Sequence, residues 1–336
     1  MSSIETRSTK IATGISRRNA IFAGLAGALI PCCAQAQANF PNRPVRMIVP
    51  FGPGGATDVT TRIAAEKLGE KYGHRFIVEN QPGPGGIAAA RTVLSSGKDG
   101  HTLGVATNGT ATSVSMFKAL PFDPLADFEM VSTLGLFEAV FVVNPESPYK
   151  TLQDFVTAAR AQPGKLNVGT VTVGGSQYLA AELFKTEAGI DFQIVTYRTS
   201  PEIVMSLLRN DIDLSIEFYT AVRAPLAERK FLALATSGLR RSATLPEIPT
   251  VQESGIAGYE VTSWNGLFVA KGTQPEIISN LNQAVHEVVA LPDVRSRFAE
   301  VGIEAAASTP EAFTARLRRD IDKWAKVIEK AGIPKQ

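Results

Sequence analysis

Short apolar runs alternate with helix-like segments along most of the chain. In the N-terminal part, the runs VRMIVPF (45–51), RFIVEN (75–80) and HTLGVAT (101–107) are separated by helical patterns over 57–72 and 87–94. Within the first of these, apolar residues recur near helical spacing, with charged residues between them. Strands that alternate with helices are typical of an α/β fold built on a parallel sheet. We therefore predict an α/β fold.

A second alternating series follows a break rich in proline and aspartate, LPFDPLADFE (120–129), and an apolar run, AVFVVNP (139–145). The pattern predicts helices over 152–161, 177–187 and 201–208, and strands over 166–170, 192–197, 212–218 and 231–237. Another apolar stretch (261–276) precedes three helical segments. Two such series predict two α/β domains with a ligand cleft between them, which we place at 39–141 plus 262–336 and at 142–261.

The first residues have the organisation of an export signal. Four basic residues precede the apolar run AIFAGLAGALI (20–30) and the small residues of PCCAQAQA (31–38). The apolar run is too short to span a membrane, which takes about 20 residues. We predict a signal peptide over 1–38, cleaved after Ala38 or alternatively after Ala36, and a periplasmic mature protein. SRRNAI (16–21) resembles a twin-arginine signal, although general secretory signals also carry paired arginines.

Composition excludes several classes of protein. With 336 residues, of which 44% are apolar, the chain has enough material for two cores. Both cysteines, Cys32 and Cys33, leave with the signal peptide, and Pro31 disfavours lipid attachment at Cys32. Removal of four basic residues and Glu5 leaves 30 basic and 31 acidic side chains, from 34 and 32. A nearly neutral chain without a basic stripe is not typical of nucleic-acid binding.

Three glycine-rich loops each follow a predicted strand and precede a predicted helix. They are Gly52 to Ala56, Gln81 to Ala89 and Gly169 to Tyr178. Open α/β sheets bind ligands at the carboxyl ends of their strands, where these loops lie. Glycine there lets backbone N–H groups and a helix N-terminus approach an anion closely, although it also simply permits tight turns.

The loops do not match known nucleotide or hydrolase motifs. None has a P-loop lysine, Pro84 removes a donor from the G-x-G-x-x-A match at 83–88, and the next strand ends at Asn108 rather than at an acidic residue. Ser176 is not in a G-x-S-x-G context, and the three histidines have no metal-site spacing. We predict no catalytic residue, no cofactor and no metal, with an exported hydrolase using Ser176 as the alternative.

Two charged residues stand at predicted strand ends. Arg198, after Tyr197, is placed to face the cleft, where a guanidinium binds a carboxylate through two parallel hydrogen bonds. Glu217 holds the equivalent position on the next strand, where it would orient Arg198 or accept a hydrogen bond from a ligand. The alternative for Arg198 is a surface ion pair. Trp264 is interpreted as a core or hinge residue.

The sequence resembles the periplasmic solute receptors of tripartite tricarboxylate transporters, also called Bug-type receptors. The resemblance covers nearly the whole predicted mature chain, in order. The matching stretches are RMIVPFGPGGATD (46–58), VENQPGPGG (78–86), LPFDPLADFE (120–129), GTVTVGGSQYLAAELF (169–184), VTYRTSPE (195–202), LATSGLRRSATLPEIPTVQESG (234–255) and WNGLFVAKGTQPEII (264–278). Two pairs of residues depart from the usual family pattern, Thr199-Ser200 and Gln177-Tyr178. The resemblance therefore does not define the ligand specificity at the distal end of the pocket.

This resemblance implies a type II periplasmic binding protein fold that closes on a small organic carboxylate, such as a di- or tricarboxylate or an aromatic acid. It implies large and small membrane subunits of a transporter as partners and a monomeric receptor, while a ligand-presenting sensor would share these features. The implied anion-binding loops are 51–58 and 169–177. The predicted ligand-binding residues are Phe51, Gly52, Pro53, Gly54, Gly55, Ala56, Thr57, Asp58, Asn108, Gly169, Thr170, Gly174, Gly175, Ser176, Gln177, Tyr197, Arg198 and Glu217.

Overall fold

The computed structural model describes residues 40–171 and 175–336, and from Phe40 onward they belong to one compact unit. The predicted signal peptide and its cleavage site lie outside the described residues, as does Gly174. Within the part described, no helix is both long and apolar enough to cross a bilayer.

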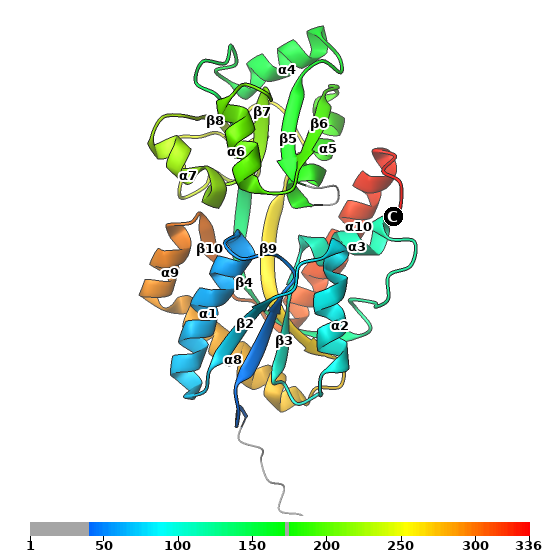
Figure 1. The fold of residues 1–336 in the computed structure, drawn as a ribbon, viewed down its shortest axis with the longest axis vertical. Coiled ribbons are helices and arrows are strands. Elements are labelled where there is room, and N and C mark those ends of the chain that lie inside the picture. Colours follow the sequence, from blue (N-terminus) through cyan, green and yellow to red (C-terminus); the bar gives the residue numbers. More distant parts are fainter. Residues whose placement is uncertain (1–39, 172–174) are drawn as a thin grey trace, which may run out of the picture. The chain divides into compact units, whose positions relative to one another are not determined.

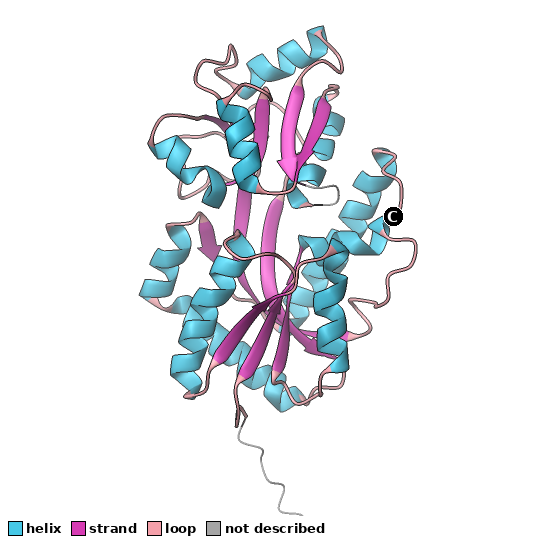
Figure 2. Ribbon diagram, viewed as in Figure 1, coloured by secondary structure: helices cyan, strands magenta, loops and turns pink. Residues whose placement is uncertain are grey.

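The described strands form one ten-stranded sheet, with helices on both faces (Figures 1 and 2). The main path runs β2-β1-β3-β9-β4-β7-β5-β6, and β8 and β10 both pair with β4. The strands are β1 Val45–Val49, β2 Phe76–Asn80, β3 Thr102–Thr107, β4 Phe128–Val143, β5 Asn167–Val171, β6 Gln193–Tyr197, β7 Leu214–Phe218, β8 Leu232–Thr236, β9 Thr262–Ala270 and β10 Ile303–Ala305.

The long strand β4 joins two halves of this sheet. Its residues from Phe128 to Glu138 pair with β9, whereas those from Ala139 onward pair with β7 and β8. We call the sheet on the β9 side, with β1, β2, β3 and β10, the first half, and the sheet on the β7 side, with β5, β6 and β8, the second half. Within each half, the strands of the alternating series are parallel: β1 with β2 and β3, and β5 with β6 and β7.

Helices cover each half because their apolar residues pack on the sheet. In the first half, α1, α8 and α9 pack on one face, and α2, α3 and α10 contribute to the cluster on the other. In the second half, α4 and α5 belong to this latter cluster, whereas α6 and α7 pack against Val140 and Val142. The helices are α1 Ala56–Tyr72, α2 Ile87–Ser95, α3 Asn108–Met116, α4 Leu152–Ala161, α5 Ser176–Ala188, α6 Ser200–Leu208, α7 Tyr219–Ala227, α8 Pro275–Ala290, α9 Pro292–Ala299 and α10 Pro310–Lys330, with a short 3-10 turn, η1, at Pro84–Gly86.

Most predicted elements are present, with two corrections. The sheet is mixed rather than parallel, because β9 and β4 run antiparallel to their neighbours. The predicted break over 120–129 ends inside β4, which begins at Phe128 and continues through the apolar run at 139–143 as a single strand. The domain boundaries stay a prediction; the one between 141 and 142 falls within β4, and the one between 261 and 262 falls at the start of β9.

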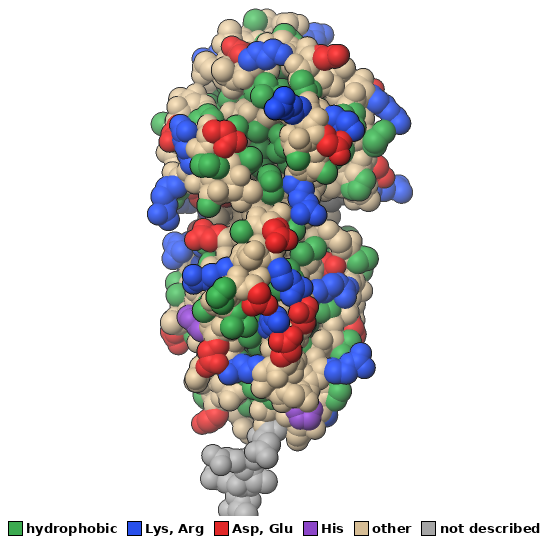
Figure 3. All heavy atoms as spheres, turned by 90° about the vertical axis from the view of Figure 1, so that its left-hand side faces the viewer, with side chains coloured by type: hydrophobic (Ala, Val, Ile, Leu, Met, Phe, Trp, Pro, Cys, Tyr) green, Lys and Arg blue, Asp and Glu red, His purple; other side chains and the backbone are tan. Residues whose placement is uncertain are grey.

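The distribution of charged side chains on the surface agrees with the nearly neutral composition. On the face drawn in Figure 3, basic and acidic side chains are interspersed rather than gathered by sign. This face therefore carries no broad basic surface of the kind that nucleic-acid binding uses.

Candidate functional site

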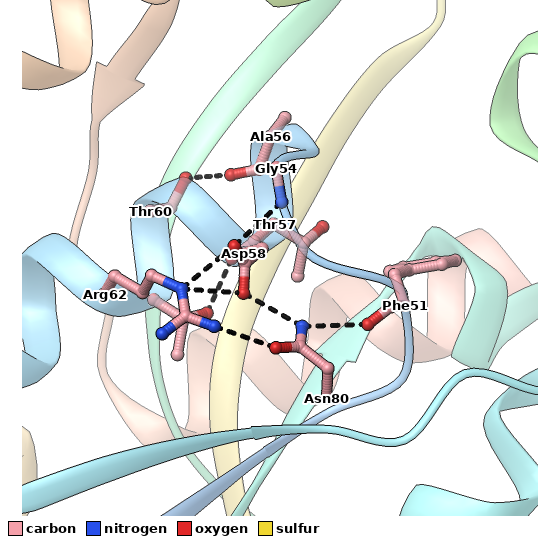
Figure 4. A network of polar contacts seen from close by, with 9 residues as sticks. Phe51, Gly54, Ala56, Thr57, Asp58, Thr60, Arg62 and Asn80 are labelled. Atoms are coloured by element: carbon pink, nitrogen blue, oxygen red, sulfur yellow. Dashed lines mark hydrogen bonds and ion pairs between the residues drawn. The ribbon is translucent and has the colours of Figure 1, made fainter. Parts of the chain in front are cut away.

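The loop between β1 and α1 is held by the buried carboxylate of Asp58. This carboxylate accepts hydrogen bonds from the Gly54 N–H (2.9 Å), the Arg62 Nε (3.0 and 3.1 Å) and the Asn80 Nδ2 (2.9 Å). Asn80 also donates to the Phe51 carbonyl and accepts from Arg62, so the network spans the whole loop (Figure 4). Asp58 and Asn80 therefore hold the loop at Gly54 and Phe51, and Arg62 holds these two side chains in place.

The charge on Asp58 is stabilised by these contacts. Burial alone would raise the pKa of the Asp58 carboxyl, but the hydrogen bonds from Arg62, Gly54 and Asn80 together outweigh it and hold the pKa below its ordinary value. Asp58 is therefore ionised at neutral pH. Since its oxygens already have these protein donors, the structure assigns its side chain to supporting the loop.

The start of α1, next to this loop, has no side-chain cap, although its first residues, Ala56 and Thr57, are buried. The N-cap of α1 is Gly55, which offers no side-chain hydrogen bond, so the first turn lacks the cap that serine, threonine or aspartate would give. Residues 51–55 are exposed, and a Cβ added at Gly52, Gly54 or Gly55 would meet no atom within 4 Å. Gly54 has a φ of +90°, which favours glycine, whereas Gly55 has an ordinary extended backbone. An anion can thus approach this helix end without a side chain in its way.

The helix α5 starts in the same manner in the second half. Its N-cap is Gly175, again without a side-chain cap, and Ser176 and Gln177 form its first turn. By contrast, α3 and α6 are capped by Thr107 and Thr199. The helices α1 and α5, which follow the two loops predicted to bind an anion, thus share a glycine N-cap that gives no side-chain hydrogen bond.

Gly169 and Thr170, predicted as ligand contacts, lie within β5. A Cβ at Gly169 would come within 2.3 Å of Ile212 Cδ1, so a larger residue there would have to displace the buried Ile212 side chain. Thr170 is fully buried and donates a hydrogen bond to the Val171 carbonyl. In the second glycine-rich loop, a Cβ at Gly85 would come within 2.5 Å of the Phe117 ring, and Gly85 and Gly86 have φ angles of +60° and +68°, which favour glycine.

Glu217 links the starts of α5 and α6. Its carboxyl is buried and accepts hydrogen bonds from Gln177 Nε2 (3.3 Å), Ser200 Oγ (3.0 Å) and the Phe218 N–H (3.1 Å). Burial raises the pKa of Glu217 to about 7, and these three donors only partly offset it. Among the described residues, its partners do not include Arg198, the partner that the sequence suggests for it.

Arg198 and Tyr197 lie at the end of β6. Arg198 is exposed, and its backbone N–H donates to Glu202 Oε2 (3.0 Å). No ion pair to its guanidinium is present within the described residues, so the surface ion pair considered as an alternative is not observed there. Tyr197 is half-buried against the cluster formed by α6 and α7.

A cluster of buried polar side chains, not expected from the sequence except for Asn108, lies at the end of β3. Asn108 Nδ2 is 3.5 Å from Ser263 Oγ, and its Oδ1 has no partner among the described residues. Asn265 is fully buried, and neither polar atom of its side chain has such a partner. Asn265 pairs with Thr107 in the β3–β9 ladder and shares a strand face with Leu267, which packs in the same cluster as Ala56 of α1. The buried polar side chains Asn108, Ser263 and Asn265 therefore lie on the sheet face that α1 covers, at the carboxyl end of β3.

The aromatic residue next to Asn265 is structural. Trp264 is fully buried, packs edge-on against Phe313, and donates from Nε1 to Asp320. The interpretation of Trp264 as a core residue is confirmed.

Comparison with known proteins gives consistent matches over nearly the whole chain. Residues 60–333 match the family model described as tripartite tricarboxylate transporter family receptor. Protein BugT of Bordetella pertussis is 31% identical over 93% of this chain and 95% of its own length. Rpa4515 of R. palustris with adipate superposes with a TM-score of 0.81 at 30% identity, covering 88% of this chain and 100% of that one. MatC of Rhodopseudomonas palustris with bound malate gives a TM-score of 0.76 at 28% identity, covering 86% and 100%. The predicted fold, a periplasmic binding protein with two α/β domains, is confirmed.

Proposed function

Because the chain belongs to the tripartite tricarboxylate transporter receptor family, we propose that it is a periplasmic receptor that captures a small organic carboxylate and delivers it to the membrane subunits of such a transporter. The ligands that we propose are di- and tricarboxylates and aromatic acids. The adipate and malate in two related structures support this ligand class. The receptor role involves no chemical change of the ligand.

The observation that carries the proposal is the pair of glycine-capped helix starts. The α1 and α5 N-termini follow the strand ends of different halves of the sheet, and neither has a side-chain cap. First-turn N–H groups and the positive end of a helix dipole both favour a carboxylate, and a glycine at the helix start has no side chain to keep it away. A capped helix such as α3, with Thr107, has less of this capacity.

A thermal-shift screen of the mature protein against mono-, di-, tri- and aromatic carboxylates tests the proposal. A ligand that binds only the folded state raises the free energy of unfolding by mass action, by about 2.7 kcal/mol at a ligand concentration of a hundred times Kd. The melting temperature rises accordingly. We expect a subset of carboxylates to give such shifts, while the matching alcohols and amides do not. Equal shifts with the uncharged analogues, or none with any carboxylate, would contradict a carboxylate receptor.

A further inference from the structure

Glu217 is an unusual carboxyl because it is buried at the proposed ligand site without a cation. It is 1% exposed, and all three of its hydrogen-bond donors are neutral: the side chains of Gln177 and Ser200 and the Phe218 N–H. Buried carboxylates usually have a positive partner, since desolvation of an unpaired charge is costly. This arrangement therefore favours a carboxyl that exchanges a proton near neutral pH.

No charged group on the elements around Glu217 supplies the missing positive partner. Arg198 and Glu202, at the start of α6, are exposed, and Glu182 of α5 is bound to Tyr178. Arg223 of α7 is also exposed and donates to the Glu300 carbonyl. On β4, Glu138 lies two residues from Val140, the residue opposite Glu217. None of these charges contributes to the pKa of Glu217, which burial raises to about 7 and the three hydrogen bonds oppose.

Glu217 is also one hydrogen bond away from the α5 N-terminus. Gln177, whose side chain donates to Glu217, lies in the first turn of α5, directly after the Gly175 N-cap. Ser200, the other side-chain donor, is the first residue of α6. A carboxylate held at the start of α5 would therefore lie close to Glu217, and two negative charges in a buried site oppose each other.

We propose that Glu217 is a proton-linked determinant of ligand affinity: the receptor binds its carboxylate ligand together with one proton, which Glu217 holds. This inference rests on the proposed function. The proton comes from solvent, binds one Glu217 oxygen, and returns to solvent when the ligand leaves. Ser200 Oγ can donate to the ionised carboxylate or accept from the protonated carboxyl, so the site accommodates both forms.

The sign of the pH dependence follows from this linkage. A bound anion raises the pKa of Glu217 above its ligand-free value of about 7. Below pH 7 the carboxyl is already protonated, so affinity is highest. Above pH 7 each binding event takes up a proton, and affinity falls by up to about tenfold per pH unit. Simple carboxylic acids, with pKa values near 4, stay ionised throughout this range.

Calorimetry between pH 6 and 9 tests the inference, with adipate, malate and any stronger binder from the thermal-shift screen as probes. Titrations in phosphate and in Tris, whose ionisation enthalpies differ, count the protons taken up. We expect uptake approaching one proton near pH 8 for the unchanged protein and none for Glu217→Gln, whose affinity stays flat with pH. Glu138→Gln is the matched control, because the pKa of Glu138 is also raised to about 7.

A second variant guards against misfolding of Glu217→Gln. Ser200→Ala removes one donor to Glu217, which raises its pKa further and moves the fall in affinity to higher pH. Binding without proton uptake, or uptake that persists in Glu217→Gln, would overturn the inference and leave the receptor function intact. If no carboxylate of the screen binds, both the proposed function and this inference fail.

Discussion

At the scale of single residues, a substitution at Asn265 tests whether its buried side-chain amide serves to bind a ligand. Its two polar side-chain atoms are buried without a partner among the described residues, which costs about 1–3 kcal/mol relative to a satisfied group. We expect Asn265→Leu to raise the free energy of unfolding of the ligand-free protein by about 1 kcal/mol, measured by urea unfolding. The same change should weaken carboxylate binding, measured by calorimetry, if a ligand supplies the missing partner.

Asn282 provides the matched control for this variant. Its Nδ2 donates to the Val131 and Ser308 carbonyls, both at 2.8 Å. Asn282→Leu should therefore destabilise the protein by about 1–3 kcal/mol, because it leaves two carbonyls with fewer donors. Equal losses of stability in Asn265→Leu and Asn282→Leu would show that both amides serve the fold alone.

Glu138 allows a pH prediction that does not depend on a ligand. Burial, followed by the nearby Glu304 and Glu260, raises its pKa to about 7 from the ordinary 4.5. Because the folded pKa lies above the unfolded one, the protonated form favours folding, and this contribution is lost as pH rises from about 4.5 to 7. We expect Glu138→Gln to be more stable than the unchanged protein at pH 8, by on the order of 1–2 kcal/mol after allowance for its partial exposure, and about equal at pH 4. Urea unfolding at the two pH values measures this, and a difference independent of pH would contradict it.

At the scale of elements, the start of α1 can be blocked without disturbing its fold. Gly55 has φ −79° and ψ 170°, which any residue adopts, and a Cβ there would meet nothing within 4 Å. Valine at this position covers the first-turn N–H groups, so Gly55→Val should bind carboxylates about 10- to 150-fold more weakly, or 1.5–3 kcal/mol. The melting temperature without ligand should stay nearly unchanged. Unaltered affinity in calorimetry would mean that the loop is only a tight turn.

The elements that the sequence predicts well are those with local signals. The strands β1 and β5 end in glycine-rich loops, and the helices α1 and α5 begin beside them, because glycine and helical spacing act over a few residues. The first part of β4 was missed, because its start lies in a stretch rich in proline and aspartate and its partner β9 is more than 100 residues away. Asn265 was missed for the same reason. The burial of its side chain without a hydrogen-bond partner among the described residues depends on how the strands pair, and no pattern in the neighbouring sequence indicates it.

The site residues show the same limit. Sequence position placed Glu217 at a strand end correctly, but its link to Gln177 and Ser200 depends on how three parallel strands align. Gly169 illustrates the opposite case, since a glycine near a loop resembles a ligand contact in the sequence but packs inside β5 against Ile212 in the structure.

At the scale of the whole molecule, Arg198 tests whether closure around the ligand contributes to affinity. It is exposed, and its guanidinium has no ion pair within the described residues, so it is available to a ligand. A helix terminus contributes typically 0.3–1 kcal/mol to a nearby anion, whereas breaking an arginine–carboxylate pair that closure shields from water costs about 2–5 kcal/mol. We therefore expect Arg198 to contribute more than either helix N-terminus.

The variant Arg198→Met keeps much of the apolar stem and deletes the charged fork. Its affinity for the carboxylates identified by the screen should fall at least about tenfold, or 1.4 kcal/mol, with little change in the melting temperature without ligand. Arg198→Lys should restore only part of this, because it keeps the charge and loses the bidentate geometry. Arg209, exposed at the opposite end of α6, is the matched control, and Arg209→Met should bind as the unchanged protein does. If Arg198→Met also binds with unchanged affinity in calorimetry, the loops and helix starts hold the anion by themselves, and closure adds no arginine contact.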